Sequence, residues 1–188
     1  IFELTVPVEI NNSTIRFSDA QKLSGHLLAE FDSNTILSSY LDEDELMEGL
    51  IQIDARVAGI ASDPVVTGTL TWNDGKLFIP ILGTLFNQVA MTGHLEDNTL
   101  VIQQLSANDG SGGTFTATGW VKNLISRKMN YQLDGKALEF ATIALDDATA
   151  TATGTITITG DTTKTDFAGV FDVHDAAFLL RPTLSKEI

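Results

Sequence analysis

The chain lacks cysteine altogether, and its 188 residues include only 4 prolines and 11 lysines and arginines. The absence of cysteine excludes a disulfide framework, thiolate zinc ligands and a cysteine nucleophile. Set against those 11 basic residues are 25 aspartates and glutamates, which give a net charge of −14. So acidic a surface repels phosphate backbones and anionic lipid head groups, so we expect no nucleic-acid partner and no direct electrostatic docking on a membrane.

Long hydrophobic runs are also missing. No apolar segment approaches the roughly 20 residues of a membrane-spanning helix, and no signal peptide is present. The sequence begins at Ile1 rather than at methionine, and a strand-like pattern starts at once. We therefore expect residues 1–188 to be a single domain cut from a longer protein, with any export signal or anchor outside it.

Most of the sequence that is present predicts β-strand. From Thr149 to Gly160, threonines alternate with alanine, glycine and isoleucine, so one side of this strand would be polar and the other apolar. Short turn signals such as Asp97-Asn98 and Gly160-Asp161 favour antiparallel neighbours. The expected strands cover residues 2–10, 13–17, 22–31, 50–58, 65–72, 76–81, 88–95, 99–105, 114–122, 129–133, 137–145, 149–160, 165–173 and 177–180. The expected fold class is all-β.

One short pattern occurs three times, at residues 8–17, 70–79 and 171–180. In each copy, apolar residues alternate on both sides of a polar or small pair that could form a two-residue turn, which predicts a β-hairpin. The expected facing pairs are Ile10 with Ile15, Val8 with Phe17, Trp72 with Leu77, Leu70 with Ile79, Val173 with Phe178 and Phe171 with Leu180. Glu9 would face Arg16 on the polar side, as a cross-strand ion pair.

Residues 34–48 depart from the alternation. Their apolar residues fall near helical spacing and Gly49 could end a helix, which predicts one short helix near residues 35–48. The acidic run at residues 42–45 lacks the alternating spacing and turn glycine of a calcium loop, so we interpret it as a solvated helix face.

The titratable residues do not predict an enzyme. His94 could coordinate a metal with Glu96 and Asp97, and His174 with Asp172 and Asp175. We count at most two ligands per site, however, and a metal site needs three or four that converge. No nucleophile elbow and no P-loop is present. We expect no catalytic residue, no metal and no cofactor.

A longer pattern covers residues 64–122. It runs through Pro64, Gly68-x-Leu70, Asp74-Gly75-x-Leu77-x-Ile79-Pro80, Leu82-Gly83, Gly93-x-Leu95, Leu100-x-Ile102, Leu105-x-Ala107 and a glycine cluster at 110–113 that leads into Phe115 and Gly119. The order of these pieces resembles the conserved core of the C-terminal domain of TamB, the translocation and assembly module protein, and the wider AsmA-like group. Gly49-Leu50-Ile51 and residues 169–180 fit the same style, so the resemblance spans most of the chain.

The resemblance implies a fold, a location and a role. The fold would be a long antiparallel sheet curved into a U-shaped trough (a β-taco) with an apolar interior. The protein would be anchored in the inner membrane of a diderm bacterium, cross the periplasm and work with TamA, an outer-membrane barrel of the Omp85 type. Proteins of this kind are implicated in phospholipid transport, outer membrane biogenesis and protein secretion, including autotransporter assembly.

An apolar groove could hold phospholipid or detergent chains while the head group stays in water. The residues expected to line it are Val8, Ile10, Ile51, Ile53, Leu70, Trp72, Leu77, Ile79, Met91, Leu100, Ile102, Phe115, Ile156, Ile158, Phe167 and Phe171. In a closed sandwich or barrel the same residues would simply be core, and the residues alone leave this open.

Two other functions remain as alternatives. An exposed sheet edge could pair with strands of outer-membrane client proteins, which would make the chain a β-augmentation scaffold or chaperone without lipid cargo. A secreted enzyme or carbohydrate-binding module would need exposed aromatic platforms, and Trp72, Trp120, Tyr40 and Tyr131 do not predict a common site.

Overall fold

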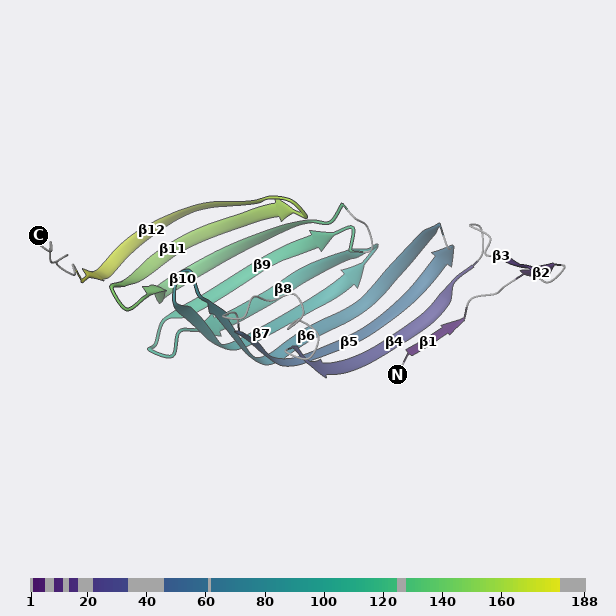
Figure 1. The fold of residues 1–188 in the computed structure, drawn as a ribbon, viewed down its shortest axis with the longest axis horizontal. Helices are drawn as coiled ribbons and strands as arrows, with labels where there is room; N and C mark the ends of the chain where they lie inside the picture. The colour runs from purple at the N-terminus through teal and green to yellow at the C-terminus, as the bar shows by residue number, and fades with distance from the viewer. Residues whose placement is uncertain are drawn as a thin grey trace, which may run out of the picture.

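The computed structural model of the chain describes residues 2–5, 9–11, 14–16, 22–33, 46–60, 62–124 and 128–179, with side chains from residue 22 onward. Nine consecutive strands, β4 to β12, form one antiparallel sheet in chain order, and the short β1 adds to its β4 edge (Figure 1). A separate hairpin pairs β2 with β3. The fold is therefore all-β, as predicted, and the sheet is not closed into a barrel.

The strands are β1 (Phe2–Thr5), β2 (Glu9–Asn11), β3 (Thr14–Arg16), β4 (Ser24–Asp32), β5 (Leu46–Ile60), β6 (Asp63–Ile79), β7 (Thr84–Glu96), β8 (Thr99–Asn108), β9 (Thr114–Lys122), β10 (Asn130–Ala144), β11 (Ala148–Asp161) and β12 (Thr165–Phe178). From β4 to β12, each strand pairs with the next strand in sequence, which is the antiparallel arrangement that the short turns predict.

The pairing register gives the sheet one apolar face. Directly paired residues point to the same side, and successive residues of a strand point to opposite sides. One paired row across β5 to β12 reads Ile51, Trp72, Met91, Leu105, Ala117, Gly135, Ile156 and Gly169; the next reads Ile53, Leu70, Gly93, Ile102, Gly119, Leu133, Ile158 and Phe167. Residues between these rows, such as Gln52, Thr71, Asp134 and Thr157, lie on the other face, which is largely polar.

Only one of the three predicted hairpins is found. Within the described residues, β2 and β3 pair as expected, with Glu9 opposite Arg16 and Ile10 opposite Ile15. Val8 and Phe17 lie outside the described residues, and so do the side chains that would form the Glu9–Arg16 ion pair.

The hairpin predicted at residues 70–79 is wrong, because β6 continues through Asp74-Gly75. Trp72 pairs with Ile51 and Met91 instead of Leu77. Asp74 has a φ of 52° and the pairing with both neighbouring strands shifts at this point. The residues that suggested a turn therefore form a β-bulge, in which an extra residue bends the strand without reversing it.

The hairpin predicted at residues 171–180 is wrong for the same reason. Phe171 and Val173 pair with β11, and the register shift next to Val173 lies at His174 rather than at a turn. Leu180 lies outside the described residues. As a consequence, β6, β10 and β12 are each one long strand where the sequence predicts two.

The C-terminal end of the predicted helix is wrong, whereas Ser33, next to its predicted start, is helical. Leu46, Met47 and Glu48 belong to β5, and Gly49 continues that strand at a bulge with a φ of 121°. Pairing of Met47 with Leu77 replaces the helical contacts that the spacing suggested. Residues 34–45, which hold the rest of the prediction, lie outside the described residues.

The sheet is bent where β8 and β9 turn. Beyond that turn, Thr84 Oγ1 donates a hydrogen bond to the Thr142 carbonyl at 2.9 Å, and the Ala144 amide donates to the Leu82 carbonyl at 2.8 Å. These bonds join the β7 end to the β10 end, although two strands separate β7 from β10 in the sheet order. Bulges on β5, β6, β7 and β10 lie towards this end and increase the local bending.

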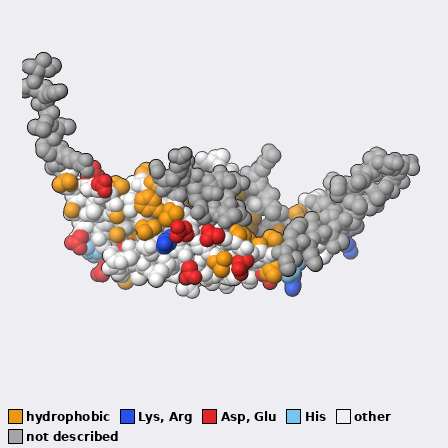
Figure 2. Space-filling view, turned by 60° about the horizontal axis from the view of Figure 1, so that its bottom comes forward, with side chains coloured by type: hydrophobic (Ala, Val, Ile, Leu, Met, Phe, Trp, Pro, Cys, Tyr) orange, Lys and Arg blue, Asp and Glu red, His pale blue; other side chains and the backbone are white. Residues whose placement is uncertain are grey.

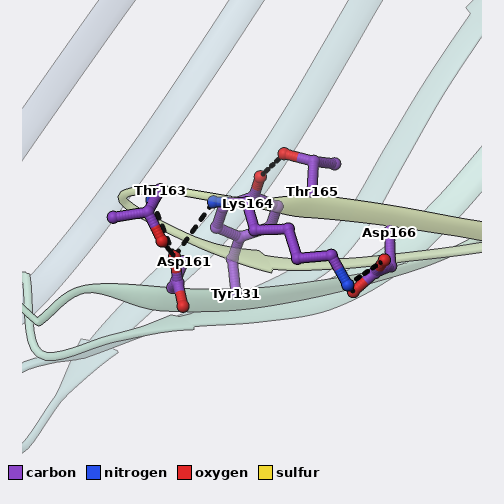
Figure 3. Close-up of polar contacts among 6 residues, drawn as sticks. All are labelled: Tyr131, Asp161, Thr163, Lys164, Thr165 and Asp166. Carbon is purple, nitrogen blue, oxygen red and sulfur yellow. Dashed lines mark hydrogen bonds and ion pairs between the residues drawn. The ribbon is translucent and has the colours of Figure 1, made fainter.

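The turn between β11 and β12 is held by its own side chains (Figure 3). The Asp161 carboxylate accepts hydrogen bonds from the Thr163 hydroxyl and amide and from the Lys164 amide. Chiefly the Thr163 hydroxyl, then these amides, lower the pKa of Asp161 below its ordinary value. Tyr131 of β10 reaches across to hydrogen-bond Thr165, which fixes the start of β12.

Asp109 connects the β8–β9 turn to β10. One carboxylate oxygen accepts from the Ser111 and Gly113 amides at 2.8 and 3.0 Å, and the other accepts from the Ala141 amide at 2.9 Å. Burial alone would raise the pKa of Asp109, but the hydrogen bonds from these amides outweigh it and hold the pKa below its ordinary value of 3.8.

We expect Asp109→Asn to lower the free energy of unfolding by about 1 kcal/mol, because the NH2 group that replaces one carboxylate oxygen cannot accept a hydrogen bond, so either the Ala141 amide or the Ser111 and Gly113 amides lose their acceptor. Because the folded pKa is depressed, the contribution of Asp109 is present above about pH 4 and is lost as the pH falls through the folded pKa. Urea unfolding between pH 7 and pH 3 measures this: the gap between wild type and variant should shrink at low pH. Asp146→Asn, at an exposed turn, removes the same charge as a control; an equal effect there would contradict the assignment.

Candidate functional site

The structure brings the predicted lining residues onto one face. This face, the apolar face, carries Ile51, Ile53, Leu70, Trp72, Leu77, Ile79, Met91, Leu100, Ile102, Phe115, Ile156, Ile158, Phe167 and Phe171, through the pairing of β5 to β12. Val8 lies outside the described residues. Ile10 belongs to the β2–β3 hairpin, which among the described residues does not pair with the main sheet.

The part of the apolar face on β5 to β8 is packed. Trp72, Val89 and Ala107 are buried there, with 5%, 1% and 7% of their surface exposed, and Met47 and Leu77 pack against them. The Trp72 indole donates a hydrogen bond to the Glu48 carbonyl at 3.0 Å, and its ring lies over Gly75, where a Cβ would be 2.6 Å from ring carbon Cε2. Buried in this way, Trp72 offers no stacking platform for a sugar.

The part on β9 to β12, together with Thr84 and Phe86 of β7, instead surrounds an apolar hollow of about 370 Å³. Three phenylalanines gather at it: the ring centres of Phe86 and Phe140 are 4.9 Å apart, and that of Phe115 lies 5.5 Å from Phe86. The hollow is lined by Leu82, Thr84, Phe86, Phe115, Ala137, Phe140, Thr142, Ile143, Ala150, Ala152, Ile156, Phe171 and Val173. The alanines are small and leave the space that larger core residues would fill.

The described residues do not seal this hollow. Phe171 and Val173, which belong to the last strand of the sheet, are 39% and 58% exposed, and Phe167 on the same face is 69% exposed. Apolar side chains of this size normally lie against a second layer of structure in a protein core. The hollow could therefore admit an apolar ligand without displacing a packed layer of the described chain.

Sequence reasoning found Phe115, Ile156 and Phe171 but missed Phe86 and Phe140. A strict period of two places Phe140 on the opposite face from Ala137, because the two are an odd number of residues apart. The structure restores them to one face through a bulge at Leu138-Glu139, where Glu139 has a φ of 49°. A bulge at Gln88, with the same φ, does this for Phe86 and Val89. No glycine marks either bulge, so the sequence offers little signal for them.

The polar face offers pairs of titratable groups rather than clusters. His26 Nε2 lies 2.7 Å from Asp54 Oδ1, and His94 Nε2 lies 3.7 Å from Glu96 Oε2. Among the described residues, no three histidine, aspartate or glutamate side chains gather closely enough to hold a metal ion. No helix in the described part of the chain has the length and apolar character to cross a membrane.

No protein-family model, no curated protein and no solved structure matches the chain. The likeness to TamB and the AsmA-like group therefore stays a prediction from the order of short sequence patterns. What the geometry adds is an open, one-sided sheet with an apolar hollow.

Phe140 should be a main source of stability at the hollow, because only 1% of its surface is exposed. We expect Phe140→Ala to lower the free energy of unfolding by about 3 kcal/mol, as truncation of a buried aromatic side chain leaves a cavity. Leu138→Ala, two residues away on the same strand and 53% exposed, is the matched control and should change it by less than about 0.5 kcal/mol. Urea titration monitored by circular dichroism compares the two; equal effects would mean that Phe140 is not packed as described.

Proposed function

We propose that the chain is a lipid-handling segment of a TamB-like envelope protein. In this proposal the sheet forms a U-shaped trough, and its apolar face holds the acyl chains of phospholipids. The observation that carries the proposal is that a single apolar face continues through paired residues from β5 to β12 without an intervening charged row.

The energetics of acyl chains support this use of the face. Removing a chain from water is worth about 0.8 kcal/mol per buried CH₂ group, and this gain requires no specific polar contact. A phospholipid could lie with its chains against the apolar face and its head group at the open rim. Exposed Phe167 and Phe171 would then be covered by lipid in the working state, which gives a reason for their exposure.

The cellular setting follows from the resemblance. We propose a periplasmic segment of a diderm bacterial protein that is anchored to the inner membrane by sequence outside residues 1–188. Its partner would be an Omp85-type barrel such as TamA, and its roles phospholipid transport and support for the assembly of outer-membrane proteins and autotransporters. The proposal assigns no catalytic residue and no cofactor.

The test is detergent-free purification from bacterial cells, followed by native mass spectrometry and lipid extraction. We expect bound phospholipid on the wild-type chain and at least about a tenfold reduction in Ile156→Asp, since a carboxylate in the hollow would have to be desolvated beside the acyl chain. Thr155→Asp is the matched control: its exposed side chain lies one residue away on the opposite face, so lipid loading should not change.

A second variant guards against loss of folding. Phe171→Asp changes a side chain that is already 39% exposed, so the sheet should tolerate it while lipid loading falls. Folded wild-type protein without lipid or detergent uptake, or lipid loading that is equal in Ile156→Asp, Phe171→Asp and Thr155→Asp, would overturn the proposal. The apolar face would then be core without a ligand.

A further inference from the structure

The edge strand β12 is exposed along its whole length. All of its residues, Thr165–Phe178, are exposed, and Val170 and Phe178 reach 76% and 71%. β11 pairs with one side of β12, and no strand of the described residues pairs with the other. The outer side of β12 therefore presents a free row of backbone N–H and C=O groups.

Natural sheets usually blunt such an edge. They do so with short edge strands, charged side chains (lysine above all), proline, or bulges that twist the edge away. β12 spans 14 residues and contains neither lysine nor proline, and its charged side chains are aspartates, which repel acidic strands but attract basic ones. Its one register shift lies at His174, so residues 165–173 remain in regular pairing with β11 and form an unbroken template for another strand.

The edge is also fixed in position before any partner arrives. The Asp161 carboxylate orders the turn that leads into β12, and Lys164 Nζ lies 2.7 Å from Asp166 Oδ1 (Figure 3). Tyr131 holds Thr165 from β10. A strand that is held in this way loses little conformational freedom on binding, which favours association.

Charge on β12 is one-sided. The register places Phe167, Phe171 and Val173 on the apolar face, and Asp166, Asp172 and Asp175 on the polar face. His174 is the only basic residue within the strand. At the β12 end of the molecule, acidic and hydrophobic side chains lie side by side at the surface (left in Figure 2). Of the three aspartates, only Asp166 forms an ion pair in the described part of the chain.

We propose that β12 binds an extended partner strand in which apolar residues alternate with lysine or arginine. The backbone of the partner would continue the hydrogen-bond ladder, its apolar side chains would extend the apolar face, and its basic side chains would face Asp166, Asp172 and Asp175. A second copy of this chain is the poorer partner, because two β12 strands bring acidic side chains together and each copy carries a net charge of −14.

The probe is a nine-residue peptide with capped termini in which valine and lysine alternate, and its binding is measured by fluorescence anisotropy. A second peptide of the same composition, the block peptide, has all its lysines in one segment and all its valines in another, and it controls for simple ionic attraction. We expect the alternating peptide to bind at least tenfold more tightly than the block peptide. The double variant Asp172→Lys/Asp175→Lys should bind it at least tenfold more weakly and should instead bind an alternating valine–glutamate peptide.

The matched control is Asp63→Lys/Glu96→Lys, which makes the same change in net charge at exposed positions of β6 and β7. Its affinity for the alternating lysine peptide should stay within about threefold of wild type. If the β12 double variant loses its fold, Asp172→Asn tests the same contact more gently. Equal losses in the β6–β7 control and in the β12 variant would overturn the proposal in favour of general charge attraction.

Amide hydrogen exchange reports the edge directly. The alternating peptide should slow exchange at every second amide between residues 166 and 173, where the free strand exposes its N–H groups, and the block peptide should not. If the peptide does not protect these alternate amides, the proposal is overturned. It is also overturned if the amides become protected without peptide as the protein concentration rises, since a second copy would then occupy the edge.

Ile156→Asp should keep peptide binding, so loss of lipid binding and loss of strand binding can be told apart.

Discussion

The structure depends on the register of one antiparallel ladder. Because each strand pairs with its neighbour in the chain, an apolar residue on β5 fixes the side on which its partners on β6 and β7 must lie. A one-residue slip anywhere would turn the apolar residues of one strand to the polar face. Three features follow from this single constraint: the separation of the apolar face from the polar face, the packed cluster around Trp72, and the apolar hollow.

Bulges give that ladder its bend. Asp74, Gln88 and Glu139 each adopt a positive φ within a strand, and each inserts a residue that the neighbouring strand does not match. The bending lets β7 and β10 hydrogen-bond across the β8–β9 turn, and it brings Phe86 and Phe140 into contact. Burial in the main sheet therefore comes largely from the curvature of the sheet at that end.

The sequence was sufficient to predict most strands and which of their residues are apolar-facing. Apolar and polar residues alternate locally, and this alternation holds in every segment between two bulges. Thr149 to Gly160 illustrates this: threonines and apolar residues alternate there, and the strand is found nearly as predicted. The sequence failed where one local signal has two structural outcomes. Asp74-Gly75 suits a hairpin turn and also a bulge, and only pairing of Trp72 with both Ile51 and Met91 decides for the bulge. For the hollow, alternation found Phe115 but could not find Phe140, whose face depends on a bulge without glycine.

A sheet with one apolar face normally needs a second layer, and none is present among the described residues. The β5–β8 part compensates by packing Trp72 and Val89 against neighbours in the same bent sheet, so it can be stable without a cover. The β9–β12 part buries Phe140 but is less completely packed, since its alanines leave a hollow and its last strand is exposed on both faces and along one edge. Two different surfaces are thus left uncovered: acyl chains would cover the apolar face, and a basic, alternating strand would pair with the β12 edge. The first surface consists of side chains and the second of backbone N–H and C=O groups, so a ligand can occupy one while the other stays exposed.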